Sequence, residues 1–203
     1  MSKLANDQDE QLSQNAVLAL GFIGAGTNNS RIAGLLRTLA IFYAKEPNHL
    51  FLVRIAQGLL HMGKGLMTLD PFRSQGQLMS KVSLAGLLTV LHICFDMKKT
   101  ILGDRHYLLF ALAMSINPRM LMTVDEDGKA VPVKVRVGQA VDTVGQAGNP
   151  RTITGFTMHT TPVLLGAKDR AELTNDEYIP STTLLEGFVV VRKNINATKE
   201  EVL

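Results

Sequence analysis

The stretch from Gly58 to Lys64 carries glycines and a lysine at the spacing of a phosphate-binding P-loop. In such a loop the backbone amides and the lysine hold phosphate, a Ser or Thr after the lysine holds Mg²⁺, and a helix begins there. Here that next residue is Gly65, and Pro71 follows too soon for a helix. We interpret the stretch as a turn between helices, and a nucleotide-binding enzyme that uses Gly58 to Lys64 stands as the alternative function.

Two other stretches lack a residue that their chemistry needs. Gly24 to Asn29 is close to a dinucleotide fingerprint, but Asn29 stands where the last glycine belongs and no predicted strand precedes it. Thr123 to Lys134 places two aspartates and a glycine as in a calcium loop, yet its last position is Lys134, which cannot be the bidentate carboxylate. The sequence therefore predicts neither a cofactor nor a calcium site.

The remaining reactive side chains show no catalytic or metal-binding pattern. Cys94 lies in an apolar helical run, where a thiolate is disfavoured. Nothing fixes the separation of Glu172 and Glu186, which would have to act as general acid and base. The histidines lack the spacing of metal ligands; they are His49, His61, His92, His106 and His159. We expect no catalytic residue and no metal, and we interpret the chain as a binding or structural protein rather than an enzyme.

The composition limits which classes of partner and which cellular compartment are expected for the chain. The 203 residues carry 21 Lys and Arg against 18 Asp and Glu, with no Trp and no basic cluster beyond Lys98 and Lys99. Nucleic-acid surfaces need a basic stripe interleaved with aromatic side chains, so nucleic acid is excluded as a partner. The longest apolar run, Leu84 to Phe95, is shorter than the about 20 residues that span a bilayer, which excludes a membrane. A single cysteine and no apolar leader favour the cytoplasm and nucleus.

The chain up to about Asn117 has the apolar spacing of helices. One predicted helix presents a single face made of Ile32, Leu35, Leu36, Leu39 and Tyr43, and residues 28–30 can cap it. Pro47 fits the first turn of the next helix, and Ser74 and Asp104 are expected to be N-caps of two more. Pro118 is expected to close the helical part.

From Met120 onward the apolar period changes to two, as in strands. Valines alternate with other residues over Val131 to Val137, and a turn at 125–128 joins this stretch to Met120 to Val124 in a predicted hairpin. Pro132 cannot donate to a ladder, which argues for an edge position. Further predicted strands are Thr152 to Phe156, Thr160 to Leu165 and Leu185 to Arg192.

The helical part contains an internal repeat of glycine spacing, which we call the echo. Gly21 to Gly26 and Gly58 to Gly63 share a glycine spacing at an offset of 37 residues, a period typical of helix-hairpin solenoids. Glycine at these positions lets helices approach closely. We therefore expect a bulky leucine at Gly26 or Gly58 to lower thermal stability.

These residues also resemble a known family. Residues 19–29 and 35–40 are similar to the proteasome/cyclosome repeat, and residues 135–148, 160–165, 170–173 and 185–194 resemble the C-terminal end of the ubiquitin-receptor type of non-ATPase scaffold subunit in the base of the proteasome regulatory particle. The similarity is recognised from about Ala16 to Asn194, while residues 1–14 match poorly.

The resemblance implies an α+β chain: proteasome/cyclosome helical-hairpin repeats of an α-solenoid or toroid over residues 1–118, then a small β-rich domain over 119–203. It marks Gly21, Gly24, Gly26, Asn28, Asn29, Gly58 and Gly63 as positions of the repeat motif. It implies a non-catalytic scaffold in ubiquitin-dependent degradation that contacts the ATPase ring of the proteasome. Family members bind ubiquitin and ubiquitin-like domains through earlier repeats, so such binding is expected of a full-length parent and not of this segment.

Overall fold

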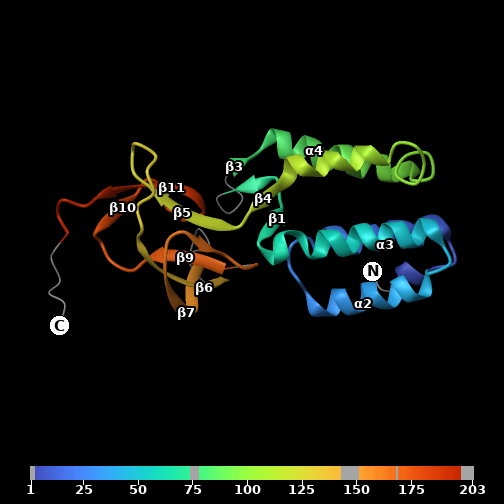
Figure 1. Ribbon diagram of the computed structural model, residues 1–203, viewed down its shortest axis with the longest axis horizontal. Helices are drawn as coiled ribbons and strands as arrows, with labels where there is room; N and C mark the ends of the chain where they lie inside the picture. The colour runs from blue at the N-terminus through green and yellow to red at the C-terminus, as the bar shows by residue number, and fades with distance from the viewer. Residues whose placement is uncertain (1–2, 74–77, 143–150, 168, 198–203) are drawn as a thin grey trace. The chain divides into compact units, whose positions relative to one another are not determined.

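The structure, a computed structural model, describes residues 3–73, 78–142, 151–167 and 169–197. The chain divides into two compact units, Met1–Pro118 and Arg119–Leu203. The first holds the helices and the second holds most of the strands (Figure 1). Each unit is described here by itself. None of the described helices is long and apolar enough to cross a membrane.

The first unit opens with a short 3-10 helix, Leu4–Asn6, and three α-helices whose ends follow local signals. Helix α1 spans Glu10–Ile23, α2 spans Ser30–Phe42 and α3 spans Pro47–Leu60. The Asn29 side chain accepts hydrogen bonds from two amides of the first turn of α2, and Pro47 occupies the first turn of α3. The predicted helix over Ile32 to Tyr43, its cap and the place of Pro47 are confirmed.

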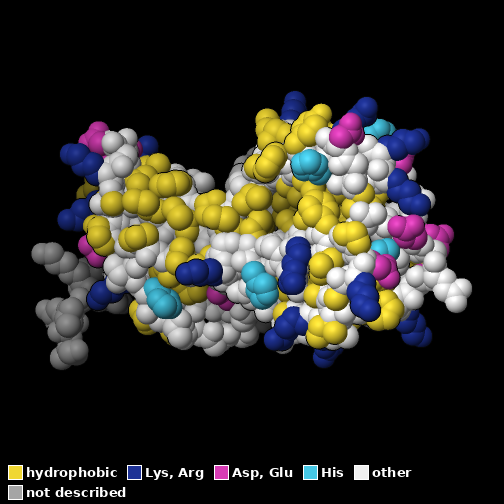
Figure 2. Space-filling view, turned by 45° about the vertical axis from the view of Figure 1, so that its right-hand side comes forward, with side chains coloured by type: hydrophobic (Ala, Val, Ile, Leu, Met, Phe, Trp, Pro, Cys, Tyr) yellow, Lys and Arg dark blue, Asp and Glu magenta, His cyan; other side chains and the backbone are white. Residues whose placement is uncertain are grey.

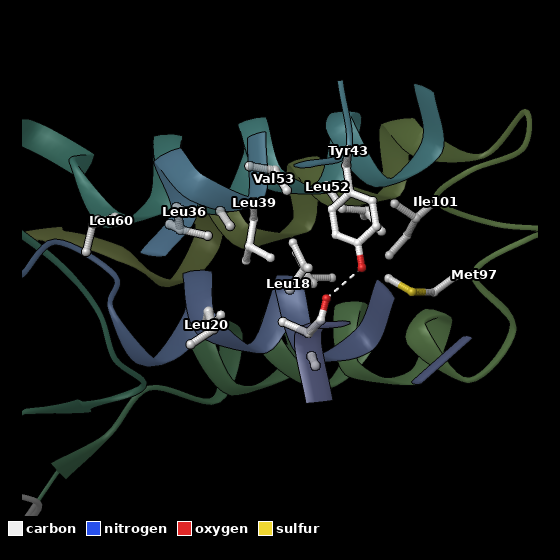
Figure 3. Close-up of a cluster of buried hydrophobic side chains, with 14 of the residues drawn as sticks. Leu18, Leu20, Leu36, Leu39, Tyr43, Leu52, Val53, Leu60, Met97 and Ile101 are labelled. Carbon is white, nitrogen blue, oxygen red and sulfur yellow. Dashed lines mark hydrogen bonds between the residues drawn. The ribbon is translucent and has the colours of Figure 1, made fainter. Parts of the chain in front are cut away.

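Helices α1 and α3 pack directly against one another, and both ends of α3 lie 37 residues after those of α1. Apolar side chains of α1, α2 and α3 form one core with residues of the segment that follows α4, as Figure 3 shows. Its fully buried members include Leu18, Leu36, Leu39, Leu52, Leu60, Met97 and Ile101. The 37-residue echo therefore corresponds to two equivalent helices that share a core.

The second half of the first unit departs from a second helical hairpin. A 3-10 turn, η2 (Met62–Gly65), leads into the short strands β1 (Met67–Leu69), β2 (Phe72–Arg73) and β3 (Leu78–Met79). These strands lie within the range 67–79, where an exact 37-residue copy of α2 would fall. Gly63 and Lys64 both adopt positive φ, which ends α3 and turns the chain away from helix. Helix α4 (Lys81–Ile93) then follows.

The predicted caps in this half need correction. The Ser80 side chain caps α4, while Ser74 lies outside the described residues. Asp104 is not an N-cap, because the segment is the 3-10 helix η5 (His106–Ser115), which begins after Arg105 without a side-chain cap. A shorter 3-10 helix, η4, spans Cys94–Asp96. The helical part ends at Ser115 rather than Pro118, because β4 (Ile116–Pro118) pairs antiparallel with β1.

The described strands of the second unit form two sheets. One has the order β10-β11-β5-β8, with β11 parallel to β5 and the other pairs antiparallel. The other has the antiparallel order β7-β6-β9. The bounds are β5 Met120–Val124, β6 Lys134–Asp142, β7 Arg151–Thr160, β8 Val163–Leu164, β9 Asp169–Leu173, β10 Tyr178–Pro180 and β11 Gly187–Lys193. The predicted mixture of helices and strands, and strands at the three later stretches, are confirmed.

The predicted hairpin between β5 and β6 is wrong beyond its turn. A single bridge joins Val124 to Ala130, after which β6 leaves for the other sheet. The reason is that β5 pairs with β11 along one edge and with β8 along the other. The hydroxyls of Thr123 and Thr161 bond to each other and to the backbone of the connection between β5 and β6. Pro132 lies in this connection, outside the strands, rather than at a sheet edge.

The alternation of valines in β6 correctly predicts which side chains are buried. Val133, Val135 and Val137 are buried, while Lys134 and Arg136 between them are exposed. The three valines pack with Leu121 and Val189 from the other sheet in one apolar core. This core stabilises the second unit separately from the first.

Candidate functional site

The residues of the glycine-rich echo meet at a junction of two turns. The turn from Gly24 to Asn29 follows α1, and η2 follows α3. The amide of Gly26 donates to the carbonyl oxygen of Leu59 at 2.9 Å, and the amide of Asn28 donates to that of Leu60 at 3.3 Å. The first turn is therefore bonded to the C-terminal end of α3, the equivalent helix of the echo.

Asn28 ties the two turns together with its side chain. Its φ is 50°, in the left-handed region that asparagine tolerates better than most residues. Its Nδ2 donates to the carbonyl oxygen of Lys64 at 2.7 Å, and its Oδ1 lies 2.8 Å from Nδ1 of His61. A Cβ at Gly65 would stand 2.5 Å from that Nδ2, so Asn28 needs glycine opposite it.

The motif glycines act in different ways. A Cβ on Gly21 would lie 2.6 Å from Cα of Ala56 in α3, and one on Gly24 would lie 2.9 Å from Cδ1 of Leu60. Gly26 and Gly63 have positive φ. Gly58 is exposed, with nothing within 4 Å of an added Cβ. The prediction that Gly58 allows a close helix approach is therefore wrong, which removes the reason to expect that a larger side chain there is destabilising.

The P-loop-like stretch has a different geometry from a phosphate site. Helix α3, not a strand, leads into it, and β1 rather than a helix follows. The amide of Lys64 donates to His61 O at 2.9 Å, and the amide of Leu66 donates to Gly63 O at 3.0 Å. These amides are already used within the turn, so they do not form the cradle that binds phosphate in a P-loop.

A second constellation joins Ser13, His49 and Glu46, which the sequence reasoning did not connect. His49 Nε2 lies 2.9 Å from Ser13 Oγ, and its Nδ1 lies 3.0 Å from a Glu46 carboxylate oxygen. Nucleophile, base and orienting carboxylate stand in this order in hydrolases. The spacing of Glu46 and His49 and the polar Ser13 on the buried face of α1 are the signals that could have revealed it.

Ser13 and His49 of this array are buried inside the helical core, while Glu46 is exposed. Ser13 is 1% exposed and His49 is 4% exposed, so a substrate cannot reach the hydroxyl. The ring of Tyr43 stacks on His49 at 4.2 Å, and the Tyr43 hydroxyl donates to Ala5 O at 2.7 Å, the bond dashed in Figure 3. Burial raises the pKa of Tyr43, partly offset by Ser13. The network satisfies polar groups within the core.

Other candidate residues have structural partners. Burial raises the pKa of Cys94 to about 11, and its thiol donates to Val90 O. Glu172 accepts hydrogen bonds of 3.0 and 2.7 Å from Arg136, as in a structural ion pair. Within the part of the chain that the structure describes, no three His, Cys, Asp or Glu side chains gather as metal ligands.

An apolar surface lies on the outside of α4 and η5. It consists of Leu88, Leu91, Phe95, Tyr107 and Phe110, which are between 52% and 80% exposed. Hydrophobic side chains gather over the helical unit in the upper right of Figure 2. We call these residues the α4–η5 surface.

Comparison with known proteins identifies similar chains. Residues 15–46 match the proteasome/cyclosome repeat, and residues 144–196 match the family of the 26S proteasome non-ATPase regulatory subunit RPN1 C-terminal region. The first match covers α2 and most of α1 together with the turn from Gly24 to Asn29.

The relatives are much longer than this chain. It is 56% identical over 200 residues to the Arabidopsis thaliana 26S proteasome non-ATPase regulatory subunit 2 homolog A and 58% identical over 198 residues to subunit 2 of Dictyostelium discoideum. Each match covers 98% of this chain and 22% of the relative. The fission yeast Schizosaccharomyces pombe 26S proteasome regulatory subunit rpn1 is 52% identical over 194 residues. A match over 98% of the chain extends into residues 1–14, outside the stretch from Ala16 to Asn194 in which the similarity was recognised.

Proposed function

We propose that this chain, which corresponds in sequence to the C-terminal part of the 26S proteasome non-ATPase regulatory subunits, is a non-catalytic scaffold segment of the proteasome regulatory particle. The similarity across 98% of the chain carries this proposal. In this role the segment supports assembly on the ATPase ring and, through a full-length parent, recruitment of ubiquitinated substrates and shuttle factors. Its place of action is the cytoplasm and nucleus.

The contacts at the junction of the two turns favour a structural role over a catalytic role. Asn28 and Gly26 bond the turn after α1 to the end of α3, which fixes two equivalent helices in register. The Ser13 hydroxyl, which stands in a hydrolase-like array, is buried, and the amides around Lys64 are engaged. Rigid stacked helices with polar groups satisfied internally suit a surface that holds partners in place.

The α4–η5 surface supports continuation of the helical repeats. Repeats of a solenoid bury their apolar faces against neighbouring repeats, and a face without a neighbour stays exposed. Phe95 and Phe110 are each 80% exposed on this surface, and apolar side chains gathered on one surface mark a contact with another protein segment. We infer that another helical repeat of a solenoid or toroid covers this face, and that residues 1–118 and 119–203 are the repeat and β-rich domains of the segment.

An exchange experiment in fission yeast tests the proposal. The matching 194-residue segment of S. pombe rpn1 is replaced by this chain. A chimera with the Arabidopsis segment serves as the control for tolerance of foreign sequence. We expect this chain to restore growth and to enter the regulatory particle on native gels as the control does. A chimera that is expressed and soluble but excluded from the particle, while the control is included, would contradict the proposal.

A further inference from the structure

Strand β7 is an unusually long edge strand. It spans ten residues at one side of the β7-β6-β9 sheet. At the opposite side, a bridge from Leu185 to Ala171 partly covers β9. The edges of the other sheet of this unit are β10, with three residues, and β8, with two. Natural proteins keep edges short or covered to prevent strand pairing. β7 is long, and among the described strands only β6 pairs with it.

The sequence of β7 lacks the usual protection of an edge. All side chains from Thr154 to Thr160 are exposed, including Phe156 at 54% and Met158 at 56%. This stretch contains no lysine, no carboxylate and no proline, the residues that ordinarily discourage pairing. It has one protective device, a bulge at Gly155, where φ is 64° and the pairing with β6 shifts. Residues 156–160 remain a regular, open edge.

The register shows which backbone groups of β7 face outward. The amide of Thr161 donates to Val133 O, and the amide of Thr174 donates to Lys134 O. Bonding directions alternate along an antiparallel strand, so Thr157 and His159 bond to β6, whereas the amides and carbonyls of Met158 and Thr160 point away from it. These outward groups are the donors and acceptors to which an added strand would bond.

Charge on one face of this sheet indicates what kind of strand fits. Met158 is opposite Arg136 in the register, and Phe156 is opposite Gly138, so both apolar side chains share the face of Arg136. The Arg136 guanidinium lies 5.9 Å from the centre of the Phe156 ring. On β6, the strand next to β7, Lys134 and Arg136 lie opposite Thr160 and Met158 on this face, while Glu172, which bonds to Arg136, stands one strand further away on β9. A partner strand with acidic residues complements this excess of positive charge.

We propose that β7 is a docking site for an extended segment of a partner protein that alternates apolar and acidic residues and adds to the sheet as a new strand. Backbone hydrogen bonds to Met158 and Thr160 supply the pairing, and the apolar side chains of Phe156 and Met158 with the neighbouring cations supply the preference. This activity lies beyond the scaffold role and does not depend on it.

A synthetic peptide of alternating valine and glutamate tests this site on the full chain. Binding is followed by NMR with amide hydrogen exchange at peptide concentrations up to about 1 mM, because strand addition to an exposed edge can be weak. In the free protein, we expect the amides of Thr157 and His159 to exchange slowly and those of Met158 and Thr160 to exchange fast, because only the first two bond to β6. We expect the peptide to protect Met158 and Thr160. The same peptide N-methylated at alternate amides should not bind, because its donors are blocked.

Two variants that introduce the same charged residue on different edge strands locate the site. Met158→Glu places a negative charge on the β7 edge, and Ile179→Glu makes the same change on β10, where Ile179 is 53% exposed. We expect Met158→Glu to weaken binding of the valine and glutamate peptide at least about tenfold, because the new carboxylate repels the glutamates of the peptide, and Ile179→Glu to leave binding within about twofold. Both variants should keep the circular dichroism spectrum of the parent chain.

Each outcome decides the proposal. Protection of residues 158 and 160, lost in Met158→Glu and with the N-methylated peptide, supports it. No binding at about 1 mM overturns it, as does binding that Met158→Glu leaves unchanged. Equal binding of a valine and lysine peptide overturns the assigned charge preference. Concentration-dependent dimers that Met158→Glu abolishes would make a second copy of this chain the occupant, and would overturn the assignment to an acidic partner.

Discussion

Alanine at two equivalent glycines should have opposite effects on stability. Gly21 in α1 and Gly58 in α3 are 37 residues apart and occupy the same place in the echo. A Cβ at Gly21 would meet Cα of Ala56 at 2.6 Å and its Cβ at 2.9 Å, whereas a Cβ at Gly58 would meet nothing within 4 Å. Sequence period alone predicts equal effects, and packing predicts different ones.

The magnitude follows from these distances. Carbon atoms in contact prefer about 3.5 to 4.0 Å, so α1 and α3 must separate by about 1 Å to accept alanine at Gly21. Overpacking of this kind costs about 1 to 3 kcal/mol, and alanine in a helix gains about 1 kcal/mol over glycine. We expect Gly21→Ala to lower the free energy of unfolding by about 1 kcal/mol and Gly58→Ala to raise it by up to about 1 kcal/mol.

Chemical denaturation followed by far-ultraviolet circular dichroism measures both variants, because the α-helices lie in the first unit. Gly21→Leu extends the series and should unfold the unit more readily than Gly21→Ala, since its larger side chain cannot fit against Ala56. If Gly21→Ala stabilises the chain as much as Gly58→Ala does, the close approach of α1 and α3 is refuted.

Three further variants test single contacts. Asn29→Ala removes the cap of α2 and should lower the free energy of unfolding by about 1 kcal/mol, measured by denaturation. Ser13→Ala leaves His49 Nε2 without its partner in the core and should cost about 1 to 3 kcal/mol, while a serine-directed fluorophosphonate probe should label neither the parent nor the variant. Because burial raises the pKa of Cys94 from 9.0 to about 11, the folded state favours the protonated thiol. Stability from this group is therefore complete below about pH 9 and lost as pH rises toward about 11. The slope of unfolding free energy over that range should be smaller in Cys94→Ala.

The sequence was enough to predict those features of the fold that depend on residues close together in the chain. The cap at Asn29, the place of Pro47 and the buried valines of β6 depend on neighbouring residues, and the structure has them as expected. The echo correctly indicated two equivalent helices. It could not distinguish Gly21 from Gly58, because the difference lies in which residue of another helix stands opposite.

Long-range pairing explains what sequence reasoning missed. Strand β5 pairs with β11 and β8, which lie further along the chain than β6. Burial of side chains from distant strands determines these partners, so the short distance in sequence between β5 and β6 was misleading. Ser13 and His49 come together only when α1 packs against α3. Asn28 was recognised as a motif residue, but its bond to Lys64 depends on the positive φ of both residues, which no pattern of residue types specifies.

The most direct test of the scaffold role is quantitative mass spectrometry of proteasomes purified through an ATPase-ring subunit from cells that produce this chain. The scaffold account predicts that peptides across residues 1–203 are recovered in amounts equal to those of the ATPase subunits and sediment with the regulatory particle. Recovery of these peptides only in fractions that lack the particle would contradict it.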